Sequence, residues 1–306
     1  MYIIWNLTRL CPWNCEFCCV SAICSKSKNG AEKIHQKEIK DKRQLTFKEK
    51  DEILKIISAK NLEIDFSGGD PLYLEDDIKI LEKAILIMPK EKIDISMTGV
   101  FIDARKINIL KQVNKVEFTL DNLEKAHNPL RPNGFNISTM KVIPKLISRG
   151  INASAVTILH KHTASKDNLR TIYKWLCKNR VKSWSVLKFY PVGRGESMKN
   201  MLLTKDDYLE IMDFLNSLKG YTEIIFQHSL RILNGSYTCH AAVETVGILP
   251  DGTVLACAWA LKNGCLPING FKIGKLPEDN FDAILKKAQE EMGYQCRCNF
   301  CRITKQ

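Results

Sequence analysis

The sequence predicts an α/β fold in which six strand–helix units in series form a parallel sheet, curved as a partial (βα)6 TIM-like barrel. Apolar strand-like runs alternate with amphipathic helix-like runs through the first two thirds of the chain. The length of 306 residues suffices for one large domain and a smaller one. After about residue 195 the alternation gives way to turns that carry cysteines. We therefore expect a small C-terminal α+β domain behind the barrel.

The individual elements follow from hydrophobic periodicity and from helix caps. The expected strands are residues 2–8, 63–67, 92–97, 115–120, 152–159 and 184–190. The expected helices are residues 46–60, 75–88, 103–113, 138–149, 165–180 and 204–219. Thr46 and Glu49 form a capping box at the start of the first helix. Because reactive groups in such sheets lie at the carboxyl ends of the strands, the loops that follow these strands are the places to search for a site.

Three further segments complete the predicted organisation. Residues 24–45 are polar and lysine-rich, and we expect an exposed excursion there. Residues 222–227 predict one more strand, and residues 278–291 predict an amphipathic helix. The turn signal Pro250-Asp-Gly-Thr253 between apolar runs predicts a hairpin with Cys257 on its second arm.

Composition and charge narrow the class of protein. Hydrophobic residues make up 45% and charged residues 26%, which is an ordinary globular balance. There is no apolar run of about 18 residues and no basic segment leading into an apolar one at the start, so we expect a cytoplasmic protein without a membrane partner. The net charge of +12 comes from scattered lysines, which favours a solvated surface over a nucleic-acid footprint.

The first strand is followed by three cysteines within eight residues, Cys11-Pro-Trp-Asn-Cys15-Glu-Phe-Cys18. Soft thiolates at this density suit an iron–sulfur cluster or zinc. Three cysteines hold three irons of a 4Fe-4S cube and leave the fourth iron open, whereas a structural zinc site takes four ligands. The alternative to a cluster is therefore a zinc knuckle that takes Cys19 or Cys24 as its fourth ligand.

The C-x3-C-x2-C spacing, with Phe17 before the last cysteine, resembles the signature of the radical S-adenosylmethionine (SAM) superfamily. The resemblance implies a 4Fe-4S cluster on Cys11, Cys15 and Cys18 whose open iron chelates the amino and carboxylate groups of SAM. It also implies that one electron, from a flavodoxin- or ferredoxin-type donor, cleaves SAM to a 5′-deoxyadenosyl radical that abstracts hydrogen from a substrate C–H bond.

Other motifs of this superfamily recur in order at successive strand ends. Gly68-Gly69-Asp70 after the second strand resembles the Gly-Gly-Glu motif that receives the amino group of SAM, with Asp in place of Glu. Thr98 and Thr119 match positions whose hydroxyls meet the SAM ribose and carboxylate. The resemblance implies these cofactor-binding residues: Gly68, Gly69, Asp70, Thr98, Thr119, Asp121, Asn168 and Arg194, the last as a clamp for a carboxylate or phosphate.

The C-terminal cysteines resemble the opening of a SPASM domain, with Cys239-x12-Gly252-x4-Cys257 followed by a C-x2-C pair. This segment has fewer cysteines than a full SPASM domain. In this respect it is similar to the shorter "twitch" domain, which carries one auxiliary 4Fe-4S cluster. The resemblance implies a barrel over residues 1–222, an auxiliary domain over residues 223–306, and the ligands Cys239, Cys257, Cys298 and Cys301. Four thiolates suit zinc equally well, so a structural zinc site is the alternative.

The function expected from this resemblance is a radical SAM enzyme that matures a ribosomally made peptide, by epimerisation or by forming a crosslink. The alternative is a small-molecule dehydrogenase or cyclase acting on a sugar, aminocyclitol or nucleotide. A non-enzymatic metal-binding protein would leave the Gly-Gly-Asp motif unexplained. Cys265 and Cys296 depart from the ligand pattern and are candidate hydrogen-atom donors. His160 and His162, in a strand-end loop, are expected to be solvated.

Overall fold

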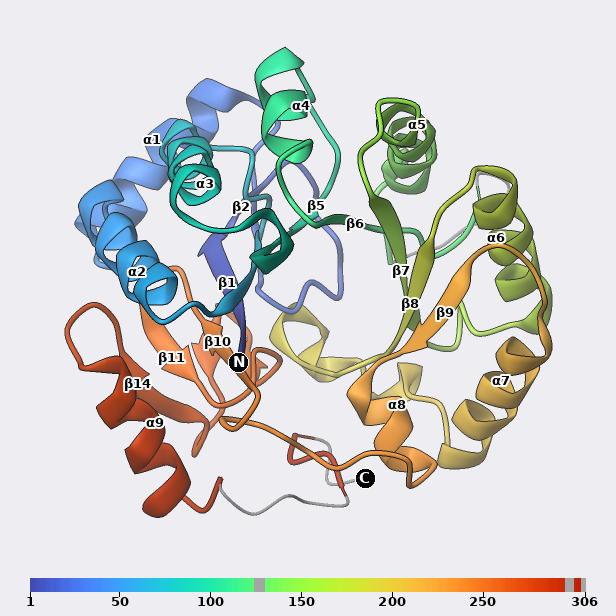
Figure 1. The fold of residues 1–306 in the computed structure, drawn as a ribbon. Coiled ribbons are helices and arrows are strands. Elements are labelled where there is room, and N and C mark those ends of the chain that lie inside the picture. The colour runs from blue at the N-terminus through green and yellow to red at the C-terminus, as the bar shows by residue number, and fades with distance from the viewer. Residues whose placement is uncertain (124–129, 295–299, 304–306) are drawn as a thin grey trace.

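The computed structural model describes residues 1–123, 130–294 and 300–303, and it confirms the predicted α/β class. Its main feature is one ten-stranded sheet in the order β14-β11-β10-β1-β4-β5-β6-β7-β8-β9. Every neighbouring pair from β1 to β9 is parallel. Figure 1 shows this sheet curved into an open ring with helices on its outside.

All six predicted strand–helix units are present. The strands are β1 (Tyr2–Thr8), β4 (Glu63–Gly68), β5 (Ile93–Met97), β6 (Lys115–Thr119), β7 (Ala153–Leu159) and β8 (Ser183–Lys188). The helices are α2 (Phe47–Ala59), α3 (Glu75–Ile87), α4 (Ala104–Leu110), α5 (Phe135–Ile147), α6 (Lys166–Lys178) and α7 (Lys205–Ser217). The predicted capping box of Thr46 and Glu49 starts α2. Large side chains such as Phe66, Phe118 and Trp184 are fully buried between the strands and these helices.

The C-terminal strands extend the sheet of the barrel. The predicted extra strand is β9 (Glu223–Phe226), which pairs with β8 at one edge and leads into α8 (His228–Leu233). The chain then crosses to the other edge, where β10 (Thr245–Ile248) pairs in parallel with β1. Antiparallel β11 (Thr253–Leu255) and β14 (Lys272–Lys275) follow, and α9 (Phe281–Glu290) packs beside β14. β12 (Leu261–Lys262) and β13 (Leu266–Pro267) form a small separate hairpin.

Two expectations about local structure are wrong. The predicted hairpin exists, but Cys257 lies two residues beyond β11 because the second arm ends at Leu255. The lysine-rich segment 24–45 is not a plain excursion, because it contains α1 (Lys28–Lys40), which begins at the N-cap Ser27. The segment is entered through β3 (Ile23–Cys24), which pairs with β2 (Leu10–Cys11).

Polar contacts dock α1 against the carboxyl end of β1. The amide nitrogen of Gln44 lies 2.8 Å from Nδ1 of the buried His35, and the hydroxyl of Thr8 donates to the Gln44 carbonyl oxygen at 3.2 Å. Glu38 in the same helix pairs with Arg9 and Arg43. None of the helices in the described residues has the length and apolarity needed to cross a membrane.

Candidate active site

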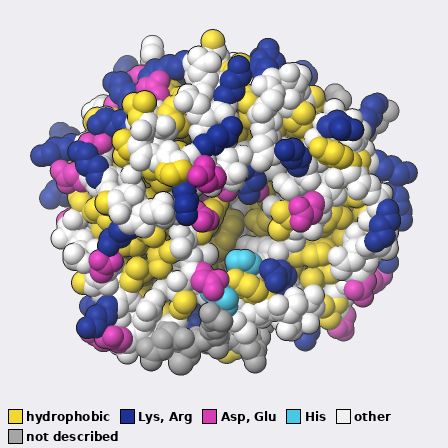
Figure 2. All heavy atoms as spheres, viewed as in Figure 1, with side chains coloured by type: hydrophobic (Ala, Val, Ile, Leu, Met, Phe, Trp, Pro, Cys, Tyr) yellow, Lys and Arg dark blue, Asp and Glu magenta, His cyan; other side chains and the backbone are white. Residues whose placement is uncertain are grey.

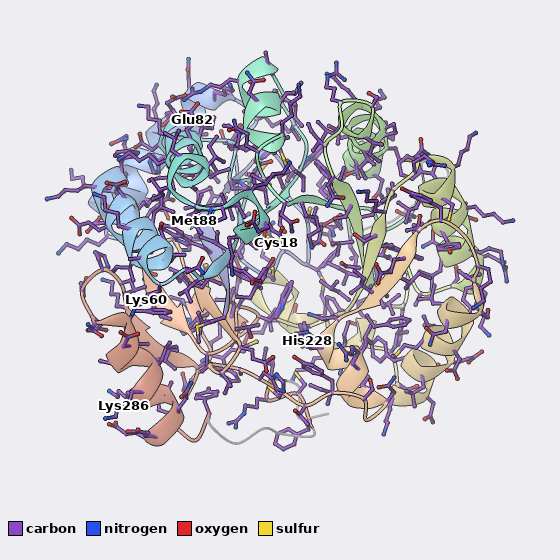
Figure 3. The ribbon with its side chains drawn as sticks, viewed as in Figure 1. Cys18, Lys60, Glu82, Met88, His228 and Lys286 are labelled. Atoms are coloured by element: carbon purple, nitrogen blue, oxygen red, sulfur yellow. The ribbon has the colours of Figure 1, made fainter. Side chains whose placement is uncertain are left out.

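The three clustered cysteines lie in the loop that follows β1, at the carboxyl end of the barrel strands. Cys11 and Cys15 are buried and Cys18 is partly buried. Each sulfur accepts an N–H hydrogen bond: Cys11 from the Trp13 amide at 3.4 Å, Cys18 from the Ala22 amide at 3.3 Å, and Cys15 from the Arg131 guanidinium at 3.2 Å. Sulfurs that receive such bonds are prepared to carry negative charge. In Figure 3, Cys18 lies inside the ring of strands, whereas Lys60, Glu82 and Lys286 lie on its outside.

The electrostatics of this loop reflect burial and the proximity of the thiols. Burial raises the pKa of Cys11, and the charges of Asp70 and of the other two cysteines raise it further. Burial also raises the pKa of Cys15, while the adjacent Arg131 lowers it. Across the described ranges of the chain, no three Cys, His, Asp or Glu side chains are arranged to hold a single metal ion. Three soft thiol sulfurs on one loop are the kind of donor set that holds a 4Fe-4S cluster.

A turn after β8 fixes the backbone of this loop. The guanidinium of Arg194 donates to the Cys15 carbonyl from Nε at 3.0 Å and from Nη2 at 2.6 Å, and to the Ala22 carbonyl at 2.6 Å. Its backbone N–H donates to the Cys18 carbonyl. A Cβ on Gly193, whose φ is +56°, would lie 2.1 Å from the Cys19 carbonyl oxygen. Arg194 thus binds the cysteine loop in this structure, and its clamp role towards SAM stays a prediction.

The Gly-Gly-Asp turn after β4 packs directly against the strand that enters the cysteine loop. A Cβ on Gly68 would lie 2.4 Å from the Thr8 carbonyl oxygen, and one on Gly69 would lie 2.2 Å from the Leu10 carbonyl oxygen. The buried Asp70 carboxylate accepts the amide N–H of Leu72 at 2.9 Å and both the amide and the hydroxyl of Thr98. The structure therefore brings the predicted residues Asp70 and Thr98 together beside Cys11.

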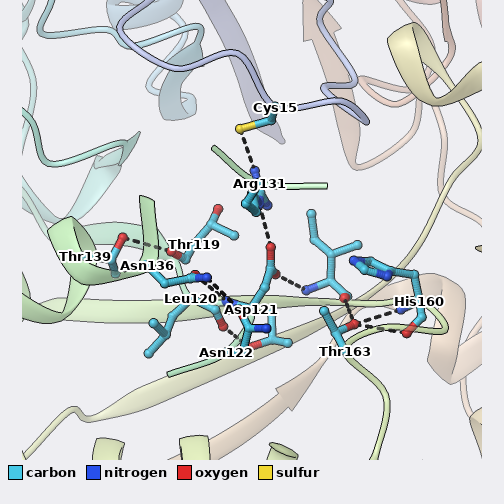
Figure 4. A network of polar contacts seen from close by, with 12 residues as sticks. Cys15, Thr119, Leu120, Asp121, Asn122, Arg131, Asn136, Thr139, His160 and Thr163 are labelled. Atoms are coloured by element: carbon cyan, nitrogen blue, oxygen red, sulfur yellow. Dashed lines mark hydrogen bonds and ion pairs between the residues drawn. The ribbon is translucent and has the colours of Figure 1, made fainter. Parts of the chain in front are cut away.

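Arg131 forms a second connection between strand ends and the cysteine loop (Figure 4). Besides its bond to the Cys15 sulfur, its Nε donates to Asp121 at 2.6 Å, and both side chains are at least nine-tenths buried. The guanidinium also lies over the rings of Phe17 and Phe135, with centroids at 4.4 and 4.5 Å. Arg131 is not among the site residues that the sequence predicts, because its partner cysteine lies 116 residues away in the chain.

Asp121 is the centre of the polar network in Figure 4. Its carboxylate also accepts the Ile158 amide at 3.1 Å, and its carbonyl accepts a side-chain N–H of Asn168 at 2.9 Å. The other amide hydrogen of Asn168 goes to the Thr163 carbonyl. The carbonyl of Thr119 accepts the Thr139 hydroxyl at 3.0 Å. The structure thus groups three predicted cofactor residues around the ends of β6 and β7, where Asp121 and Asn168 hold the backbone.

His160 is not solvated, contrary to the prediction for this loop. Its side chain is fully buried at the end of β7, against the rings of Phe17 and Phe189, and its Nε2 has no hydrogen-bond partner among the described residues. Burial lowers its pKa to about 4. The imidazole is therefore neutral at physiological pH, and it packs as an aromatic wall next to the cysteine loop. The strand-end position was visible in the sequence, but the aromatic partners were not.

The described C-terminal cysteines form two groups. Cys239, Cys257 and Cys301 form one group. Burial raises the pKa of Cys257 to about 12, and the charges of Cys301 and Cys239 add to the rise. Burial also raises the pKa of Cys239, and the charge of Cys301 adds to that rise as well. Cys265 lies apart from them, packed with Cys18 and Cys19 behind the N-terminal loop. The predicted ligand Cys298 and the candidate donor Cys296 lie outside the described residues.

Comparisons with known proteins agree with this architecture. The model of the radical SAM superfamily matches residues 5–207, more than half of the chain. No curated protein sequence gives a significant match. Streptococcus suis SuiB bound to precursor peptide SuiA superimposes with a TM-score of 0.69 and 15% identity, over 96% of this chain and 65% of that chain. The chain thus spans slightly less than two thirds of the length of SuiB.

A second group of similar structures belongs to anSMEcpe. The form with bound AdoMet and Cp18Cys peptide has a TM-score of 0.63 and 14% identity, over 96% of this chain and 81% of that chain. The histidine-tagged form with bound AdoMet has a TM-score of 0.65 and 15% identity, over 100% of this chain and 87% of that chain. At these identities the likeness establishes the fold alone.

Proposed function

This chain belongs to the radical SAM superfamily, and from that premise we propose that it is a peptide-modifying enzyme with its cluster on Cys11, Cys15 and Cys18. When bound, such a cluster supplies the electron that cleaves SAM, which yields the radical that takes hydrogen from the substrate. The observation that carries the proposal is the set of three sulfurs on one strand-end loop, each accepting an N–H bond.

The residues around the loop have two tasks in this proposal. Arg194 and Gly193 hold the loop backbone, so that the three thiols keep their spacing. The buried rings of Phe17, in the loop itself, and His160 pack edge to face, and in this proposal they exclude water from that part of the site. Exclusion of water protects a reactive intermediate from side reactions.

SAM is proposed to bind between the cysteine loop and the strand ends. Asp70 would receive its amino group, and the hydroxyls of Thr98 and Thr119, at the ends of β5 and β6, would meet its ribose and carboxylate. The remaining proposed cofactor residues either shape the backbone at these ends or anchor the loop: Gly68, Gly69, Asp121, Asn168 and Arg194. A flavodoxin- or ferredoxin-type protein is the proposed electron donor.

A peptide is the proposed substrate because two structures of similar fold contain one. SuiB is bound to precursor peptide SuiA, and anSMEcpe to Cp18Cys peptide. The modification proposed is an epimerisation or a crosslink. In an epimerisation a thiol such as Cys265 or Cys296 would return a hydrogen atom to the substrate radical, and one electron and one proton from the donor system would restore the thiol.

The test is anaerobic reconstitution with iron and sulfide, followed by dithionite and SAM. Wild type is expected to form 5′-deoxyadenosine, and a variant with Cys11, Cys15 and Cys18 all changed to Ala is expected to form none. Cys24→Ala is the matched control, because Cys24 pairs with Cys11 across β2 and β3 without belonging to the motif. Product from the triple variant would overturn the proposal.

We propose further that residues 223–306 bind one auxiliary 4Fe-4S cluster through Cys239, Cys257, Cys298 and Cys301, behind a barrel of residues 1–222. The proximity of the three described thiols supports this ligand set. Iron analysis is expected to give about eight irons per chain in wild type and about four in the Cys11/Cys15/Cys18 triple variant, at four per cube. Zinc instead of iron in the triple variant would exclude the auxiliary cluster.

A further inference from the structure

The inner wall of the barrel is polar and open along β4, β5 and β6, unlike the packed core of most such barrels, where branched apolar side chains fill the interior. Successive strand residues point alternately outward and inward. The outward residues, such as Val116 and Phe118, are buried against helices, whereas the intervening inward ones are partly exposed. On β4, β5 and β6 these inward residues are Ser67, Ser96, Glu117 and Thr119, whereas the inward positions of β7 and β8 include the apolar Ile158 and Leu187. Figure 2 shows the corresponding hollow at the centre of the molecule.

Three carboxyl groups and one ammonium group line this wall near the amino ends of the strands. Lys115 lies 3.4 Å from Glu117 and 3.8 Å from Asp94. Asp94 also accepts a hydrogen bond from the Tyr2 hydroxyl at 3.0 Å. Oδ2 of Asp65 accepts one from the Ser96 hydroxyl at 2.9 Å. Asp65, Asp94 and Lys115 are neighbours across β4, β5 and β6. The wall therefore carries more potential negative charge than positive charge.

One carboxyl oxygen in this group of charged side chains has no hydrogen-bond partner among the described residues. Oδ1 of Asp65 is buried and makes no hydrogen bond there, and the residue as a whole is 9% exposed. Burial raises the pKa of Asp65 to about 8, and the charges of Glu117 and Asp94 add to the rise. Burial raises the pKa of Glu117 as well, and that of Tyr2 in the same cluster. An unpaired buried carboxyl oxygen is costly, so a donor bound beside it would be favourable.

We propose that this inner wall, the cation subsite, recognises an alkylammonium group of the substrate, such as a lysine side chain of a peptide, with Asp65 as its main acceptor. The inference rests on the proposed function and names the chemical class of its substrate. An ammonium group offers three N–H donors, and the hydroxyls of Ser67 and Ser96 provide further acceptors beside the carboxyl group. Placing a cation here also balances the excess of carboxyl groups over Lys115.

The test compares two probes of the same shape on the full, reconstituted chain with SAM bound: Nα-acetyl-lysine N-methylamide and the uncharged Nα-acetyl-norleucine N-methylamide. Calorimetry is expected to show at least about tenfold tighter binding of the lysine probe. Asp65→Asn is expected to reduce this preference to about twofold or less. Glu210→Gln, an exposed carboxylate on α7, is the control and is expected to keep the preference.

A second readout follows from the protonation of the carboxyl groups in the cation subsite. Asp65 faces Asp94, Glu117, Lys115 and Tyr2, and its carboxyl group holds a proton near pH 7 when no further cation is bound beside it. Binding of the ammonium group is therefore expected to release protons near pH 7. Titrations in two buffers of different ionisation enthalpy measure this release, and Asp65→Asn is expected to abolish it. Where Asp65→Asn fails to fold, Glu117→Gln replaces it, with the same loss of preference expected.

Equal binding of the two probes, or a preference that survives in the folded Asp65→Asn variant, would overturn the cation subsite. Formation of 5′-deoxyadenosine in the same preparations keeps the two proposals apart. SAM cleavage without lysine preference refutes the subsite and leaves the enzyme proposal standing. Lysine preference without SAM cleavage supports the subsite and refutes the enzyme proposal.

Discussion

Arg131 joins two buried groups, the carboxylate of Asp121 and the sulfur of Cys15. Arg131 and Asp121 form an ion pair that is buried away from water. Removal of either side chain therefore leaves the charge of the other uncompensated. Hydrogen bonds to cluster sulfurs and nearby charges are also among the factors that set a cluster's reduction potential. This one side chain therefore links the stability of the barrel to the electronic environment of a cysteine.

Arg131→Met is expected to destabilise the protein by about 3–5 kcal/mol, since Asp121 stays buried and unpaired. Adding Asp121→Asn is expected to recover part of that loss. Urea unfolding of both single variants and the double variant measures the coupling, and strictly additive effects would contradict it.

The cluster's reduction potential, followed by spectroscopic titration, is expected to fall in Arg131→Met. Arg170→Met removes an exposed ion pair and is expected to cost less than about 1 kcal/mol.

Asp65 gives stability a dependence on pH. Its pKa is about 8 in the folded chain because of burial, against about 3.9 in an unfolded one. The folded chain therefore holds a proton that the unfolded chain has lost, and this contribution is full below about pH 4 and declines as pH rises towards 8. The slope is at most about 1.4 kcal/mol per pH unit for one proton.

Asp65→Asn is expected to flatten this dependence, because an amide does not titrate. Urea unfolding of wild type and variant at about pH 5.5, 6.5 and 7.5 measures the slope. Burial also raises the pKa of Asp77, to about 6, so some slope is expected to remain. Identical slopes in wild type and variant would show that Asp65 does not hold a proton in the folded chain.

Single residues differ in how far sequence could predict them. Cys11, Cys15 and Cys18 are recognisable because their chemistry lies in the spacing of adjacent residues. Arg131 and His160 gain their importance from burial and from partners distant in the chain, which no local pattern encodes. The residues expected around SAM do meet at neighbouring strand ends, because parallel topology brings those ends to one edge.

At the scale of elements, the turn after β8 controls the shape of the cysteine loop. Gly193→Ala would add a Cβ within 2.1 Å of the Cys19 carbonyl oxygen at a φ of +56°, so the loop or the turn must move. We expect less iron per chain after reconstitution, with the helical content unchanged. Gly150→Ala is the matched control, since its φ of +76° carries similar backbone strain but its Cβ meets nothing within 4 Å. Equal iron loss in both variants would show that backbone strain at a positive φ, and not the contact with the cysteine loop, causes the loss.

The helix α1 shows where element prediction failed. Its buried face consists of Ala31, His35 and Glu38, two of which are polar, so hydrophobic periodicity gave no signal. The helices of the barrel, by contrast, bury apolar residues at helical spacing, such as Ile53, Leu54 and Ile57, and all six were predicted. Polar docking through Gln44 depends on contacts across the chain and is invisible in a local window.

At the scale of the whole molecule, one sheet contains both the barrel strands and the C-terminal strands. β10 pairs with β1 from Tyr2 opposite Thr245 to Trp5 opposite Ile248. A chain ending at residue 236 would leave β1 as an unprotected edge with buried apolar neighbours. We expect this shortened chain to aggregate, as measured by size-exclusion chromatography beside the full chain. A monomeric product that unfolds cooperatively would show that the barrel folds independently.

The bonds from Arg194 to the cysteine loop bear on the order of biogenesis in the cell. They join backbone carbonyls to a guanidinium and involve no thiol, so these bonds do not depend on a bound cluster. Polypeptide folding can then precede metallation, and the scaffold proteins that deliver iron and sulfide would meet a finished receptor instead of a nascent chain. In small metal-dependent domains, by contrast, the metal itself drives folding. Cells starved of iron would on this account accumulate folded, cluster-free enzyme ready for rapid activation when iron returns.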